Sequence, residues 1–111
     1  MNTRDRNPDR RASVRYSCRS NARLCFPPAA DHESCVHARA RDISSGGLSL
    51  IVSQWFGQGT PLRVELQNEA RGVSRQLSAC VMHSTLLPDG SWFIGCAFTE
   101  RLGPEELADF I

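Results

Sequence analysis

The chain has 111 residues, of which 41% are hydrophobic and 23% charged, a length that suits one domain with a single modest core. Its net charge is only +1, but residues 1–41 hold nine arginines against four acidic residues, whereas residues 42–111 hold four against eight. This asymmetry favours an anionic partner for the basic part and argues against a general nucleic-acid binder, so neither DNA nor RNA is expected as a partner.

The beginning of the chain is polar and charged over residues 1–14, which predicts a flexible arm. We place the domain boundary inside this flexible stretch, after residue 9. Residues 1–9 are then the arm alone, and residues 10–111 are the domain, which begins with the rest of the flexible stretch. The arm has no apolar stretch of the kind that a secretory signal needs, and no run in the chain approaches the length of a transmembrane helix. A cytoplasmic protein without membrane insertion is therefore expected.

Six later stretches alternate apolar and polar side chains with a period of two, the pattern of strands with one buried face. They cover residues 22–26, 36–40, 48–52, 62–66, 77–81 and 92–98. Turn residues separate them, notably Pro27-Pro28, Gly57–Pro61 and Pro88–Gly90. Six short strands at this close spacing predict a mainly β fold, a small six-stranded antiparallel barrel.

The end of the chain has a different pattern. Pro104 suits a first helical position, two glutamates follow it, and Leu107, Phe110 and Ile111 are spaced as one apolar face of a short helix. So short a helix is not stable alone in water. We therefore expect it to dock on the barrel or on a partner.

Two separated motifs carry the functional signal. Arg11 and Arg15 stand four residues apart, and about thirty residues later comes the run Asp42-Ile43-Ser44-Ser45-Gly46-Gly47, with the pattern D-x-S-x-x-G. The planar fork of arginine donates to phosphate and to the O6/N7 edge of guanine. A carboxylate accepts from the N1–H and N2–H groups on the opposite edge, and glycine lets a backbone approach a ligand closely. Together these residues could hold a guanine nucleotide from both sides.

The two motifs, in this order and within a six-strand pattern, resemble those of the PilZ domain family of bacterial cyclic di-GMP receptors. That family has an R-x-x-x-R segment ahead of a six-stranded split barrel, matched here by Arg11–Arg15, and a D/N-x-S-x-x-G turn, matched by Asp42–Gly47. Gly95-Cys96-Ala97-Phe98 matches a further family pattern in the last strand. The resemblance runs from about Arg10 to the end of the chain and implies a non-enzymatic receptor.

The resemblance also implies a role for each matched residue. Arg11 and Arg15 would reach the phosphates and the Hoogsteen edge of a guanine. Asp42 would take the Watson–Crick edge, and Ser44 would add a hydroxyl contact. The ligand is cyclic di-GMP, and no other cofactor and no metal is implied.

Three further positions follow from the same resemblance. Gly47 and Gly95 would give the base room to lie against the sheet. Arg10, just before the first motif arginine, makes binding of a stacked ligand pair plausible. Because the arginines sit on an arm expected to be flexible, ligand binding would order that arm and change the surface offered to a downstream protein partner.

The sequence leaves two alternatives to this function. The first is a protein–protein adaptor on the same barrel that does not bind the nucleotide. The second is a small enzyme or metal protein, but the sequence has no paired carboxylates and no nucleophile with a base, and His83 is interpreted as a strand or rim residue.

Cysteines in a chain of this size can serve as metal ligands or as disulfide partners. Cys18, Cys25, His32, Cys35 and His37 match no usual ligand spacing, so a metal site is not predicted. Five cysteines leave one unpaired in any disulfide scheme, which fits a reducing compartment, and Cys96 is expected to be a small core residue.

Overall fold

The structure is a computed structural model, which describes residues 14–18, 20–26 and 34–111. Seven strands and one helix lie in these ranges. They are β1 (Tyr16–Ser17), β2 (Asn21–Phe26), β3 (Ser34–Ile43), β4 (Gly47–Val52), β5 (Pro61–Asn68), β6 (Val73–Leu86), β7 (Trp92–Phe98) and α2 (Pro104–Ala108).

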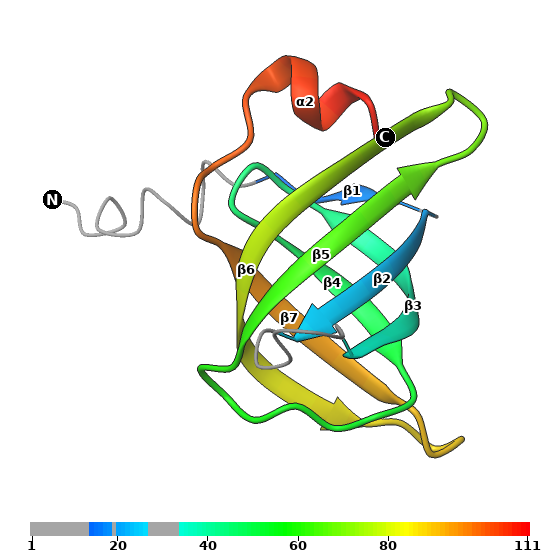
Figure 1. Cartoon of the computed structure of the whole chain (residues 1–111), viewed down its shortest axis with the longest axis vertical. Coiled ribbons are helices and arrows are strands. Elements are labelled where there is room, and N and C mark those ends of the chain that lie inside the picture. Colours follow the sequence, from blue (N-terminus) through cyan, green and yellow to red (C-terminus); the bar gives the residue numbers. More distant parts are fainter. Residues whose placement is uncertain (1–13, 19, 27–33) are drawn as a thin grey trace, which may run out of the picture.

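Six of the strands form a closed antiparallel barrel (Figure 1). The hydrogen-bonded order is β3-β2-β5-β6-β7-β4, and β4 pairs back with β3 to close the sheet. All six predicted strands are present, so the predicted barrel is confirmed. The seventh strand, β1, was not predicted. It adds to the end of β3, with Tyr16 opposite Ile43 and Ser17 opposite Asp42.

The core fills the barrel with the apolar residues that the period-two pattern points inward. The largest fully buried side chains include Leu24, Leu48, Leu50, Val64, Leu66, Val81 and Ile94. Burying each such side chain is worth roughly 1.5–3 kcal/mol relative to leaving it exposed. Cys96 is 6% exposed and belongs to this core, as predicted.

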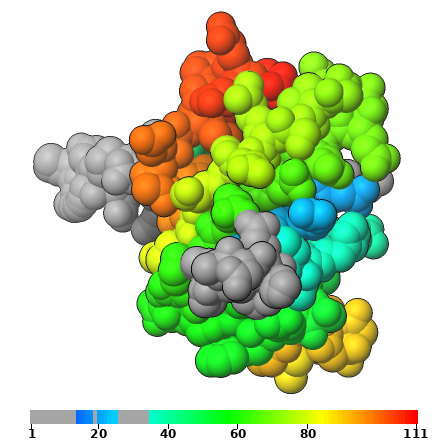
Figure 2. Space-filling model, viewed as in Figure 1, coloured from blue at the N-terminus to red at the C-terminus, as the bar shows by residue number. Residues whose placement is uncertain are grey.

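The C-terminal segment docks on the barrel (Figure 2). Of the two predicted positions for it, on the barrel or on a partner, the structure shows the first. Phe110 is only 2% exposed and Leu107 packs against the core cluster. Asn68 donates to the main-chain oxygen of Asp109 at 2.8 Å, and Arg75 donates to the carboxylate of Asp109 at 3.3 Å. These contacts hold the end of the chain beside the β5–β6 hairpin. Within the described part of the chain, no helix is long and apolar enough to cross a membrane.

Two of the cysteines pair near the end of β2 and the beginning of β3. Cys25 and Cys35 are direct partners across these antiparallel strands, with Cα atoms 4.2 Å apart, and they form a disulfide. Cys18, Cys80 and Cys96 are free thiols. The residues that the structure describes include no group of three potential metal ligands, and His32 lies outside those residues.

Candidate functional site

The candidate site begins at an irregularity in β3. The pairing register between β3 and β4 shifts between Ala40 and Asp42, so Arg41 is an extra residue. Ala40 and Ile43 are both buried in the core, and the two residues between them both leave it. Such bulges redirect side chains and are frequent beside functional sites. This bulge is what turns Asp42 to the outer surface of the barrel.

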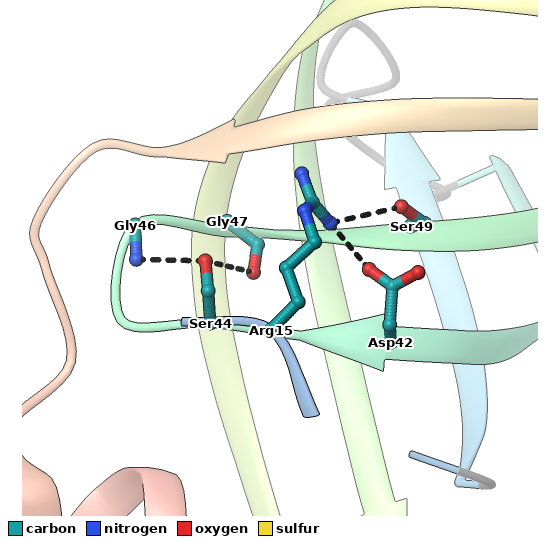
Figure 3. A network of polar contacts seen from close by, with 6 residues as sticks. All are labelled: Arg15, Asp42, Ser44, Gly46, Gly47 and Ser49. Carbon is teal, nitrogen blue, oxygen red and sulfur yellow. Dashed lines mark hydrogen bonds and ion pairs between the residues drawn. The ribbon is translucent and has the colours of Figure 1, made fainter. Parts of the chain in front are cut away.

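Arg15 comes directly before β1 and lies over the outer face of β3 and β4 (Figure 3). Its Nη1 donates to Oδ1 of Asp42 and, at 3.3 Å, to the hydroxyl of Ser49. The Arg15 side chain is 55% exposed and that of Asp42 is 28% exposed. The structure thus brings together the second motif arginine and the motif aspartate, 27 residues apart in the sequence.

The D-x-S-x-x-G run forms the tight connection between β3 and β4. The Ser44 N–H donates to the Gly47 oxygen at 2.8 Å, and the Ser44 hydroxyl accepts from the Gly46 N–H at 3.2 Å. The same hydroxyl donates weakly to the Gly47 oxygen at 3.4 Å, and Ser44 is only 3% exposed (Figure 3). In this structure Ser44 therefore stabilises the turn that follows Asp42, and its contact with a ligand stays a prediction.

Gly47 has a structural reason to be glycine. A methyl group there would collide with the backbone carbonyl oxygen of Cys96 on β7. The neighbouring backbone cannot rotate away as a flexible side chain would. Close approach of β4 to β7 thus depends on this glycine, independently of any ligand.

At Gly95, an added methyl group would collide with a side chain and not with the backbone. A second register shift, between Val81 and His83, puts His83 opposite Gly95 in the β6–β7 pair. A methyl group on Gly95 would lie 2.7 Å from Nε2 and 3.1 Å from Nδ1 of His83, so the imidazole lies over the glycine. His83 is exposed and lies in β6, in agreement with its interpretation as a strand residue.

Four of these residues form one continuous row across the barrel surface. Asp42 pairs with Ser49, Ser49 with Gly95, and Gly95 with His83, on β3, β4, β7 and β6 in turn. Four strands at normal spacing span about 14 Å between the outer two. The row has a carboxylate and Arg15 at one end, small residues in the middle and an imidazole at the other end. Ser49 and His83 were not predicted as site residues.

The Cys96 thiol belongs to the residue that follows Gly95 in β7. Burial, with a smaller effect from Cys80, raises the pKa of Cys96 to about 12. The Cys96 thiol therefore stays protonated at neutral pH, and it packs rather than reacts.

The turn is also bonded to the end of β7 and to the connection from β7 to α2. The N–H groups of Phe98 and Leu102 donate to the oxygens of Gly46 and Ser45, each at 2.8 Å. Arg101 adds a 2.7 Å hydrogen bond from Nη2 to the Ser45 hydroxyl. These three bonds fix the turn on its outer side. Sequence reasoning missed this contact, because nothing in the pattern of residues 99–103 shows where that connection runs.

The remaining predicted site residues cannot be placed. Arg10 and Arg11 lie outside the described residues, so their roles stay predictions. Of the predicted residues within the described ranges, Arg15 and Asp42 are in direct contact, whereas Ser44 and Gly47 shape the adjoining turn. Gly95 lies two strands away from Asp42 in the same row.

Comparison with solved structures gives several similar folds. The chain is similar to the Bacillus subtilis inhibitor of motility MotI/DgrA, with 17% identity and a TM-score of 0.63, over 86% of this chain and 46% of that one. It is similar to MrkH of K. pneumonia in its complex with c-di-GMP, with 17% identity and a TM-score of 0.61, over 81% of this chain and 44% of that one.

A third similar structure is the PilZ domain of YcgR from Escherichia coli with c-di-GMP. It has 14% identity and a TM-score of 0.63, over 91% of this chain and 86% of that one. The chain therefore spans slightly less than half the length of MotI/DgrA and MrkH but most of the YcgR domain. At these identities the likeness shows the fold. No curated protein sequence matches the chain.

A family model described as the PilZ domain matches residues 9–111, which is nearly the whole chain. The match includes both motifs and every strand of the barrel. On this match, the chain belongs to the PilZ domain family.

Proposed function

We propose that this domain is a receptor for cyclic di-GMP, without catalytic activity of its own, and that the ligand binds on the outer face of β3, β4 and β7. The observation that carries the proposal is the contact of Arg15 with Asp42 beside the buried hydroxyl of Ser49. A guanidinium and a carboxylate held together match the two hydrogen-bonding edges of guanine. Family membership and the c-di-GMP complexes of MrkH and YcgR support the same ligand.

The ion pair between Arg15 and Asp42 gives the proposal a mechanism. A guanine that enters between the two side chains accepts from Arg15 at O6 and N7 and donates to Asp42 from N1–H and N2–H. The existing pair is partly exposed, with side-chain exposures of 55% and 28%, so opening it costs at most about 1 kcal/mol. Each charge-assisted hydrogen bond to the ligand contributes about 1.5–3 kcal/mol, so the exchange favours binding.

The other end of the row offers the imidazole ring of His83 to the ligand. The small residues Ser49 and Gly95 keep the middle of the row low, and the imidazole of His83 lies over Gly95. Stacking of a base on a ring is worth about 1–3 kcal/mol and does not depend on which base it is. The specificity for guanine thus comes from Arg15 and Asp42, and the His83 end adds affinity.

Signalling follows from the position of Arg15 in the chain. It directly precedes β1, so a ligand that moves Arg15 acts where the N-terminal arm joins the barrel. Arg10 and Arg11 on that arm would contribute to the phosphates, and the ordered arm would present a new surface to a protein partner. Arg10 further favours two stacked ligands rather than one.

Calorimetric titration of the purified full chain with cyclic di-GMP tests the proposal. Cyclic di-AMP is the matched control, because adenine presents an N6–H₂ donor where guanine has the O6 acceptor. We expect cyclic di-GMP to bind and cyclic di-AMP not to bind. No binding of cyclic di-GMP at millimolar concentration would refute the receptor function and favour the adaptor on the same barrel.

A further inference from the structure

A second polar surface lies beside the candidate site without sharing a residue with it. It is a pocket of about 460 Å³ where the connection from β1 to β2 crosses β3. Its lining consists of two guanidinium side chains, three short hydroxyl or amide side chains and one alanine: Arg39, Arg41, Ser17, Ser20, Asn21 and Ala40. Every polar side chain in this lining can donate a hydrogen bond, and none is acidic.

The β3 bulge creates this pocket as well as the first site. Arg39 lies opposite Asn21 and is exposed, and the extra residue Arg41 is exposed directly before Asp42. Without the bulge, strict alternation would send one of the two neighbours Arg41 and Asp42 into the core. Because of the bulge, both side chains face outward. Asp42 lies in the first site, and Arg41 lines the pocket.

Backbone hydrogen bonds hold the two sides of the pocket together. The Cys18 N–H donates to the Arg41 oxygen at 3.0 Å, and the Ala40 N–H donates to the Ser20 oxygen at 2.9 Å. Ser20 is only 6% exposed, so one wall of the pocket is a buried polar residue. The pocket is thus built on fixed backbone and not on mobile side chains alone.

The two pocket arginines differ from other arginines of the barrel in their charge balance. Arg15, Arg23 and Arg75 each contact a carboxylate, whereas Arg39 and Arg41 have no acidic partner among residues 14–18, 20–26 and 34–111. Two guanidinium groups that line one pocket, with no acidic partner among the described residues, repel each other and attract an anion. An oxoanion would relieve that repulsion and accept from both forks.

We propose that the Arg39/Arg41 pocket is a second anion site, which binds a phosphate group. The two guanidinium groups donate to phosphate oxygens, and the hydroxyl and amide groups of Ser17, Ser20 and Asn21 complete the shell. Phosphate fits better than a carboxylate, because its four oxygens, ester oxygens included, point in tetrahedral directions toward several donors, whereas a carboxylate has two oxygens in one plane.

Two sources can supply such a phosphate group. One is the phosphodiester of a second cyclic dinucleotide bound next to the first, since Ser17 is the direct partner of Asp42 across β1 and β3. The other is the phosphate of a separate molecule. Both use the same chemistry at Arg39 and Arg41, and the experiment separates them.

Titration with pyrophosphate, followed by amide chemical shifts, tests the pocket directly. We expect the largest shifts at residues 17–21 and 39–41, and a loss of affinity of at least fivefold in Arg39→Gln and in Arg41→Gln. Arg71→Gln is the matched control, because Arg71 is an exposed arginine in the turn between β5 and β6, and it should bind as the wild type does. Wild-type affinity in both pocket variants, or shifts centred on Asp42, would overturn the proposal.

The pyrophosphate experiment does not need the proposed function, so it can succeed where cyclic di-GMP binding fails. A second experiment, which rests on the proposed function, uses calorimetry to count the cyclic di-GMP molecules bound by the Arg39→Gln/Arg41→Gln double variant. A fall from two ligands to one identifies a second dinucleotide as the source. An unchanged stoichiometry, with pyrophosphate binding lost, identifies a separate phosphate ligand.

Discussion

Replacement of Arg15 by alanine tests whether this residue binds the ligand or only forms an ion pair at the surface. If Arg15 only pairs with Asp42, its loss changes stability slightly and nothing else. If Arg15 binds guanine, its loss weakens cyclic di-GMP binding much more than it destabilises the fold. The variant therefore needs two measurements, a calorimetric titration and a thermal unfolding curve.

The size of both effects follows from the exposure of the pair. A charge-assisted hydrogen bond to the ligand contributes about 1.5–3 kcal/mol. The free protein gives up the contact with Asp42 to make it, and such a pair, with Arg15 55% exposed, is worth about 0–1 kcal/mol after screening by solvent. With the pair taken at about 0.5 kcal/mol, the middle of that range, the net loss in Arg15→Ala is about 1–2.5 kcal/mol, which is roughly a five- to seventyfold weaker affinity. The expected loss of unfolding free energy is at most about 1 kcal/mol.

Arg23 provides a closely matched control. Its side chain is also 55% exposed and it also contacts a carboxylate, with Nε 3.2 Å from Oε1 of Glu65, but on β2 and β5. Arg23→Ala should lose a similar small amount of stability and keep full affinity for cyclic di-GMP. Equal affinities in the Arg15 and Arg23 variants would refute the assignment of Arg15 as a ligand residue.

Three further predictions test the row and its support. His83→Ala should weaken cyclic di-GMP binding by about 1–3 kcal/mol in the same titration, the scale of base stacking, and an unaffected affinity would remove His83 from the site. Gly47→Ala should lose about 1–3 kcal/mol of unfolding free energy through overpacking and lower the Tm by at least about 4 °C. Gly103→Ala is its control, because a methyl there meets only Glu106 Oε1 at an ordinary 3.6 Å, and an equal Tm in both variants would contradict the clash. Since the pKa of Cys96 is raised to about 12, iodoacetamide at pH 8 should label the more accessible Cys80 and spare Cys96 until the protein unfolds, as read by mass spectrometry. Labelling of Cys96 in the native protein at the rate of Cys80 would show that it is not held neutral.

The sequence was sufficient to predict the barrel but not the whole length of its strands. Regular alternation marked all six barrel strands, and the apolar spacing near the end marked the docked C-terminal segment. The strand β6 runs from Val73 to Leu86, although only its middle, residues 77–81, was predicted. Beyond Val81 the alternation changes phase at the bulge, so the pattern no longer indicates a strand. The two-residue strand β1 is too short to produce any period at all.

The candidate site was predicted in part, for a similar reason. The motifs named Arg15 and Asp42, which the structure brings into contact. Ser49 and His83 belong to no motif, and they join the row only through strand pairing between segments far apart in the sequence. A lone serine between two leucines, or a histidine in a mixed polar stretch, is ordinary on the outer face of any strand.

The two bulges explain why the alternation of apolar and polar residues predicts the fold more readily than the site. In an ideal strand that ran on from the buried Ala40, Arg41 would face outward, Asp42 would point inward and Ile43 would face outward. The extra residue in β3 lets Arg41 and Asp42 both face outward, and the shift after Val81 similarly brings His83 over Gly95. Both ends of the row therefore depend on departures from the alternation that builds the barrel. Removing one residue beside either bulge would restore regular pairing and dismantle the row while leaving the core strands able to pair.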